Sequence, residues 1–241
     1  MSALARVVSS EWLKIRTVRS SLWFLGGATA IMLLTSVLQA DDGDPSTVAS
    51  TASVIGSTQY FVQFLAAAFG ILAITAEFAS RSITVTFACT PSRTRVLSAK
   101  ALVVATSVLV AGVAVAGLGL LAAAIRLGEL GDLTGGDVAL VLRLGVFLAL
   151  LATVGLGFGG LFRRTAGALS FVLFLLLLMP ELLGLLAQRF GWSWLETAID
   201  YTPAPAGYAL VQGDWLFGGV LLIWAVGLVA GSAWVLRRRD V

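Results

Sequence analysis

Six long apolar runs dominate the chain, and shorter polar or charged segments separate them. They cover residues 21–39, 54–76, 99–124, 138–162, 166–186 and 216–236. Each is long enough to cross the hydrocarbon core of a membrane, which takes about 20 residues per helix. The strands of a membrane β-barrel would instead alternate polar and apolar residues over about 10 positions. We therefore predict an all-α integral membrane protein with six transmembrane helices, forming one transmembrane domain over residues 1–241.

The composition supports this prediction. Of the 241 residues, 59% are hydrophobic and only 12% are charged. A water-soluble globule needs more polar side chains than that to cover its surface. The composition therefore excludes the soluble classes of protein and makes the lipid bilayer the first expected partner.

The distribution of Lys and Arg predicts the orientation, because cationic loops stay on the cytoplasmic side. Four segments carry 13 of the 16 basic residues: the N-terminal arm, the loop 77–100, the turn 163–164 and the C-terminal tail. Six spans place all four on one face, so both termini are predicted to be cytoplasmic. The net charge of +3 then reflects membrane topology, and nucleic-acid binding is the weaker interpretation.

The N-terminal arm, residues 1–20, is amphipathic. Leu4, Val8, Trp12 and Ile15 fall on one side at helical spacing, although Glu11 intrudes on that side. We predict an interfacial helix that lies along the membrane before the first span. The alternative is a simple positive-inside anchor. The residues expected to carry the role of this helix are Glu11, Trp12, Lys14 and Arg19.

The loop of residues 77–98 is the most polar stretch between the early spans. Its middle, residues 82–87, alternates polar and apolar residues, which alone would suggest a strand. A lone strand beside a membrane has no partner for its edges, so we predict a short amphipathic helix or turn. Thr90 and Pro91 are then the N-cap and first residue of a helix that runs into the third span, with Arg93, Arg95 and Lys100 around its cytosolic end.

These cations are explained by anchoring alone, but the apolar side chains of the loop are not. Ile83, Val85 and Phe87 form an apolar surface outside the membrane, which is typical of a surface that a partner covers. The loop is thus predicted to be a docking element and not an active site.

Glycines near the end of the fourth run match a nucleotide-binding pattern by chance. Residues 155–160 fit GxGxxG, but they lie inside an apolar span with no preceding strand. Gly155 and Gly159 at a spacing of four residues are typical of close helix packing instead.

The fifth run contains Pro180 and Glu181. Proline removes one backbone hydrogen bond from a helix, and a carboxylate at membrane depth marks a pathway or gate unless it reaches the external interface. Both readings stay open. The following segment, residues 187–215, is rich in Trp and Tyr but too short in apolar length to span, so we predict an interfacial or partly re-entrant external segment.

The residues that most catalytic sites need are missing. The chain has no histidine and a single cysteine, and it contains neither a GxSxG nor a GxxxxGK[ST] motif. We predict no catalytic residue, metal or cofactor in this chain, which is therefore expected not to be an enzyme.

The whole pattern resembles the membrane subunit of a type-2 ABC transporter, the bacterial export-type permease family. The resemblance covers nearly the full length and is most specific in the 77–100 stretch, where an E-x(3)-R-x(2)-T…P-x-R…K pattern occurs. Smaller similarities lie at residues 163–167 and 201–207. The residues that carry the main pattern are Glu77, Arg81, Thr84, Pro91, Arg93 and Lys100.

The resemblance implies a function. Residues 81–87 would form a coupling helix that enters a cleft in a separate ABC ATPase dimer, which holds ATP and Mg²⁺, with the N-terminal arm against the same partner. Two permease subunits, identical or different, would enclose a pathway that exports a hydrophobic or amphipathic substrate across the bacterial plasma membrane. The implied ATPase-coupling residues are Glu77, Arg81, Thr84, Val85, Phe87, Pro91 and Arg93.

Two other functions remain open from the sequence. A gradient-driven carrier would need a buried ionisable residue along its path, for which Glu181 is the candidate. A membrane assembly or sensor subunit would have partners without ATPase activity.

Overall fold

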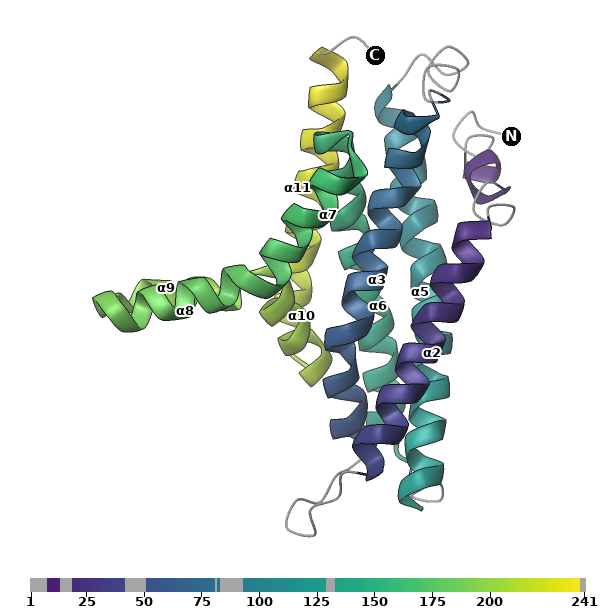
Figure 1. The fold of residues 1–241 in the computed structure, drawn as a ribbon, viewed down its shortest axis with the longest axis vertical. Helices are drawn as coiled ribbons and strands as arrows, with labels where there is room; N and C mark the ends of the chain where they lie inside the picture. Colours follow the sequence, from purple (N-terminus) through teal and green to yellow (C-terminus); the bar gives the residue numbers. More distant parts are fainter. Residues whose placement is uncertain are drawn as a thin grey trace.

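The chain folds into an elongated bundle of helices with one helical hairpin that projects from its side (Figure 1). In the computed structural model, residues 8–13, 19–41, 51–80, 82, 93–128 and 133–238 are described. These residues form helices and short turns, with no strand among them. The predicted all-α class is therefore confirmed for this part of the chain.

In the described part of the chain, five long helices run along the bundle, and shorter helical elements connect the last two of them. The long helices are α2 (Arg19–Asp41), α3 (Thr51–Ala79), α5 (Arg93–Leu127), α6 (Gly135–Phe162) and α11 (Trp215–Arg238). The connecting elements are α7 (Thr165–Leu173), the π-helix η1 (Phe174–Leu178), α8 (Met179–Phe190), α9 (Ser193–Asp200) and α10 (Pro203–Gln212).

By length and composition, five helical stretches in the described part of the chain can cross a membrane. They are Gln59–Ala79, Thr94–Leu127, Gly135–Phe162, Thr165–Phe190 and Trp215–Arg238. They correspond to the last five predicted apolar runs and are those of a multi-pass membrane protein. The first predicted run forms helix α2, in which the apolar stretch Gly26–Thr35 is shorter than a span.

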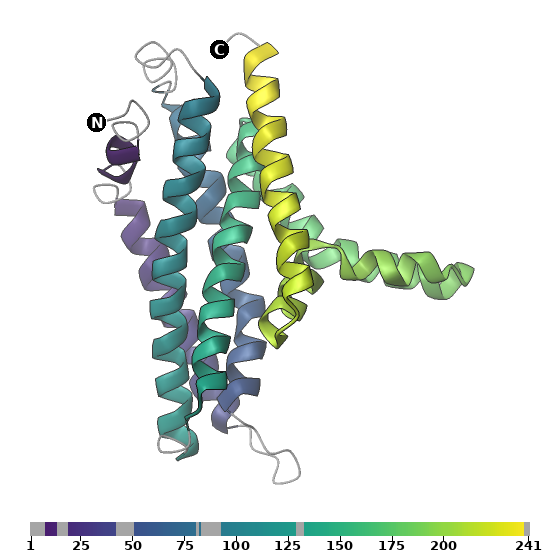
Figure 2. The same cartoon turned by 180° about the vertical axis from the view of Figure 1, so that it is seen from behind.

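Helix α6 forms the centre of the bundle, where it packs against α3, α5 and α11 (Figure 2). Its contact with α3 is backbone to backbone. A Cβ atom added at Gly155 would lie 2.2 Å from the carbonyl oxygen of Ala67, and one at Gly159 would lie 3.0 Å from that of Ile71. Only glycine allows so close an approach. The predicted packing role of these two glycines is confirmed.

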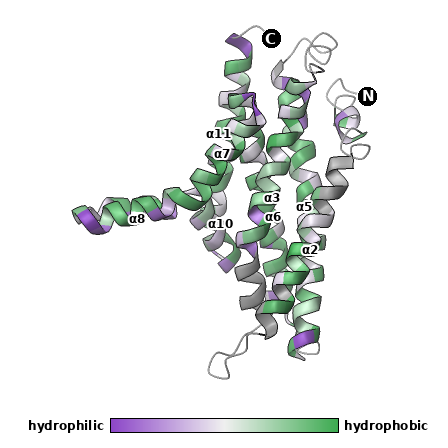
Figure 3. Ribbon diagram, viewed as in Figure 1, coloured by the Kyte–Doolittle hydropathy of each residue, from purple (hydrophilic) through white to green (hydrophobic). Residues whose placement is uncertain are grey.

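The two ends of the bundle differ in charge. At one end of the bundle α2, α5 and α7 begin, and α3, α6 and α11 finish there. We call this end the basic end. It holds Arg95, Lys100, Arg163, Arg164, Arg237 and Arg238. Hydrophilic residues lie toward the ends of the helices and at the tip of the projecting hairpin, while the middle of the bundle is hydrophobic (Figure 3).

The projecting hairpin consists of α8 and α9, residues 179–200. The predicted fifth span does not continue straight: it follows the bundle as α7 and η1 and then turns sideways as α8 (Figure 1). The turn has two adjacent causes. In η1 the N–H of Met179 bonds to the carbonyl of Phe174, which widens the helix, and Pro180 has no N–H to donate.

The predicted external segment, residues 187–215, is helical. Gly191, with φ of 67°, ends α8 and reverses the chain into α9. The two helices pack through the buried Ala187 and Leu195. The chain then returns to the bundle, where the indole N–H of Trp224 donates to the carbonyl of Tyr201 at 3.0 Å.

Candidate functional site

A buried lysine joins three segments at the basic end. Lys100 of α5 is only 5% exposed, and its ammonium group donates to Glu11 Oε2 and to Glu77 Oε1, the second at 2.9 Å. Glu11 and Glu77 are themselves only 3% and 9% exposed. We call these three side chains the Lys100 cluster.

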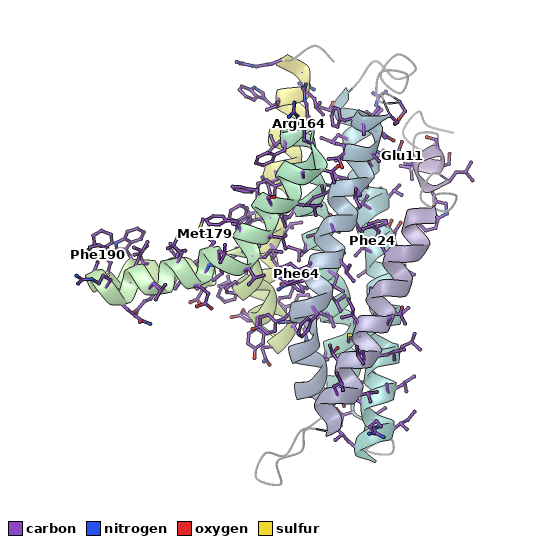
Figure 4. All side chains as sticks on the ribbon, in the orientation of Figure 1. Glu11, Phe24, Phe64, Arg164, Met179 and Phe190 are labelled. Carbon is purple, nitrogen blue, oxygen red and sulfur yellow. The ribbon has the colours of Figure 1, made fainter. Side chains whose placement is uncertain are left out.

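The cluster links parts of the chain that are far apart in sequence. Glu11, in the helical segment 8–13, precedes Lys100 by 89 residues (Figure 4). Glu77, in the last turn of α3, precedes Lys100 by 23 residues. A lysine suits this role because its ammonium group carries three N–H donors that can point to different acceptors. The N-terminal arm, α3 and α5 are thereby tied together.

Helix stability does not explain the position of Glu77. A carboxylate in the last turn of a helix meets the negative end of the helix dipole, which disfavours it. Burying a charge also costs several kcal/mol for each ion, and that cost is recovered only with good partner geometry. The Lys100 cluster therefore connects the segment 8–13, α3 and α5 to one another, and it does not stabilise the end of α3 on its own.

Three further contacts tie other helices to the same end. The hydroxyl of Thr165, at the start of α7, donates to that of Thr75 on α3 at 2.9 Å. The guanidinium of Arg163 lies 5.7 Å from the centre of the Phe78 ring, in the range of a cation–π contact. On the other side, Arg237 of α11 donates to the hydroxyl of Thr94 on α5 at 3.3 Å.

The remaining cations of the basic end behave as membrane anchors should. Arg95, Arg164, Arg237 and Arg238 are exposed, and the Arg238 guanidinium lies 4.2 Å from the centre of the Trp234 ring. Exposed cations beside aromatic rings at the end of a span are typical of an interface. Lys100 is different because it is buried and paired with two carboxylates.

The structure brings together two of the predicted site residues and leaves others outside its description. Glu77, predicted for ATPase coupling, and Glu11, predicted for the interfacial helix, meet on Lys100, while Trp12 is exposed. Arg93 and Arg19 are the first residues of α5 and α2, and their side chains lie outside the described part. The described part of the structure also does not include the predicted site residues Lys14, Arg81, Thr84, Val85, Phe87 and Pro91.

Sequence reasoning missed the ion pairs, although two signals were present. Lys100 lies just inside the predicted third apolar run, with Ala99 and Ala101 beside it. Glu11 interrupts the apolar side of the N-terminal arm. A cation inside an apolar run and a carboxylate on an apolar helix face together indicate a buried pair, since either alone would be costly to bury.

The other predicted position lies elsewhere. Pro180 is in the first turn of α8, and Glu181 beside it is exposed at the root of the hairpin. Neither lies in the Lys100 cluster. Among the described residues, no group of three or more His, Cys, Asp or Glu side chains is placed to hold a metal ion.

Comparison with known proteins gives no assignment. No protein-family model matches the chain, and no curated protein matches it.

Proposed function

We propose that this chain is the membrane-spanning permease subunit of an ATP-driven ABC exporter in a bacterial plasma membrane. In this proposal α2 is the first of six spans, both termini are cytoplasmic, and the loop 77–98 docks on a separate ABC ATPase dimer that binds ATP and Mg²⁺. A second permease subunit completes the pathway for a hydrophobic or amphipathic substrate. The chain itself carries out no catalysis.

The Lys100 cluster is the observation that carries the proposal. A coupling loop must transmit a displacement, and it does so only if its two ends are held rigidly to the helices that move. Glu77 and Lys100 flank the loop and are bonded to each other, and Glu11 adds the N-terminal arm to the same body. Glu77 and Lys100 are the first and last residues of the permease pattern described above.

The displacement has a route into the bundle. Closure of the ATPases would move the loop and, with it, the ends of α3 and α5. Helix α3 is in backbone contact with the central helix α6 at Gly155 and Ala67, and closely packed interiors transmit displacements well. A push on the loop would thus tilt the centre of the bundle relative to the second subunit.

No comparable observation favours the gradient-driven carrier. Its candidate, Glu181, is exposed on the hairpin and lies outside the bundle core. Among the described residues, the buried ionisable side chains lie at one end of the bundle, with Lys100 in the first third of α5. A sensor or assembly subunit differs from the proposed permease in that its partner would have no ATPase activity.

The test is to isolate the partner and measure ATP hydrolysis. The full chain would be co-expressed with candidate ABC ATPase subunits of the same genome, and any complex would be reconstituted in nanodiscs. We expect a stable complex in which Glu77→Gln and Arg81→Ala both alter the rate of ATP hydrolysis, because coupling requires that the loop 77–98 is fixed to the helices beside it. Glu196→Gln serves as a matched control, since Glu196 is an exposed carboxylate on α9.

Two results would overturn the proposal. One is a folded chain that binds no ABC ATPase. The other is a complex in which Glu77→Gln and Arg81→Ala leave hydrolysis and transport unchanged. The first would favour the carrier, and a partner without ATPase activity would favour the sensor or assembly role.

A further inference from the structure

A cavity of about 200 Å³ lies between α2, α3 and α5, with α6 behind it. Its floor consists of buried side chains, among them Val62, Val115 and Leu148. Its rim is half-buried and includes Phe24 and Ala28 of α2 and Ala111 of α5. The cavity is therefore closed toward the centre of the bundle and accessible from its periphery.

The lining is apolar. Among the described lining residues, Ser107 supplies the one side-chain hydroxyl, and that hydroxyl already donates to the carbonyl of Val103 at 2.6 Å. A buried water needs two to four polar partners, and cavities without them stay dry or bind apolar molecules; a Leu, Ile and Phe-lined cavity of about 150 Å³ binds benzene. The cavity between α2, α3 and α5 thus favours hydrocarbon over water.

The cavity lies within the membrane-crossing part of the helices. Along α5 its lining extends from Ser107 to Val115, which at 1.5 Å per residue is about 10 to 22 Å beyond Lys100. The rim lies beside the exposed side of α5, because Ser107 and Ala111 are half-buried and their neighbours Thr106 and Val110 are exposed. A lipid chain beside α5 could enter without leaving the hydrocarbon.

Small residues create the space, and two aromatic rings border it. Ala28 on α2 and Ala111 on α5 leave room where longer side chains would fill it. Phe24 and Phe69 meet edge to face, with their ring centres 5.8 Å apart. Such a pair forms a rigid apolar wall.

We propose that this cavity is a binding site for one acyl chain of a membrane phospholipid. The site belongs to a single copy of the chain and is independent of the ATPase partner and of the transported substrate. A bound chain would fill the wedge between α2 and the α3–α5 pair, and it would hold α2 in place by dispersion contacts with Phe24 and Phe69.

The test uses the full chain in nanodiscs that contain a phospholipid with a diazirine in the middle of one acyl chain. After photolysis, mass spectrometry locates the labelled residues. We expect label on cavity residues such as Phe24 and Leu65 to exceed that on the exposed Ile223 of α11, which does not line this cavity.

Variants that fill the cavity make the test specific. Ala28→Phe and Ala111→Phe each place a ring at the rim, from different helices, and each is expected to reduce cavity labelling severalfold. The matched controls are Ala30→Phe and Ala114→Phe, because these alanines are exposed on the same two helices and should leave that labelling unchanged. A thermal unfolding curve shows whether each variant is folded.

Three results would overturn the inference. Label on the cavity residues of the wild-type chain could be no higher than on exposed residues. The filling variants could be folded and labelled as strongly as the wild type. The control variants could also reduce the labelling, in which case general lipid contact explains it.

Discussion

The Lys100 cluster at the basic end of the bundle and the charged residues of the α8–α9 hairpin differ in their burial. At the basic end, Glu11, Glu77 and Lys100 are turned inward and paired across long sequence separations. On the hairpin, Glu181, Arg189, Glu196 and Asp200 are all exposed. The hairpin is stabilised instead by contacts between neighbours, including the stacked rings of Phe190 and Trp192 at 5.0 Å and of Trp192 and Trp194 at 6.1 Å.

This difference indicates that the Lys100 cluster must keep its side chains in fixed relative positions, whereas the α8–α9 hairpin can shift relative to the bundle. Buried ion pairs tolerate little movement, because each charge loses its compensation when the partner moves away. Stacked aromatic side chains and a helical hairpin can shift together without exposing a buried charge. Changes at the basic end should therefore propagate through the bundle, and changes in the hairpin should remain local.

The largest effect is expected from Lys100→Met. It removes the ammonium that Glu11 and Glu77 share, and losing one partner of a buried pair typically costs about 3–5 kcal/mol. Steric trapping in bicelles reports the free energy of unfolding. Arg95→Met is the matched control, because Arg95 is an exposed cation on the same helix; an equal loss in both variants would show that burial of Lys100 is irrelevant.

Glu11→Gln should have a smaller and more selective effect. It removes one charged hydrogen bond, worth about 1.5–3 kcal/mol, but keeps the bond between Lys100 and Glu77. We expect amide hydrogen exchange to rise in residues 8–13 and to stay unchanged in α8 and α9. Unchanged exchange in residues 8–13 would mean that Glu11 does not hold the N-terminal arm in place.

Gly191→Ala should have the smallest effect. The φ of 67° at Gly191 costs an alanine about 1–2 kcal/mol, while a Cβ atom there meets no other atom within 4 Å. The exchange of α8 and α9 should rise, and that of residues 8–13 should not. Gly167→Ala is the control, since a Cβ atom at Gly167 lies at an ordinary 3.6 Å from Phe162 and its φ is not positive.

Apolar length and glycine spacing were enough to predict most of the fold. The long helices follow the apolar runs, and Gly155 and Gly159 pack as their spacing indicates. The sideways turn after η1 was not predicted, because Leu175 to Leu178 are as apolar as a straight span and hydrophobicity does not specify direction. Pro180 indicated that the helix is interrupted near this position, but it did not indicate the direction in which the chain continues.

The candidate site was predicted less completely, because pairing is a tertiary property. The pattern identified Glu77 and Glu11 as separate elements of the loop and the arm, but it contained no information on their distance. Lys100 was grouped with Arg93 and Arg95 around one end of a helix, while three-dimensional packing buries it against Glu11 and Glu77. Only the positions of α3 and of the segment 8–13 beside α5 show that one lysine serves both carboxylates.

The most direct test of the proposed function asks which end of the molecule contacts an ABC ATPase. A photo-reactive benzoylphenylalanine would replace either Phe87 in the loop 77–98 or Trp192 at the tip of the hairpin, in the full chain co-expressed with the ATPase. The proposed coupling predicts a covalent ATPase adduct from position 87 and none from position 192. No adduct from position 87, or equal adducts from both positions, would contradict it.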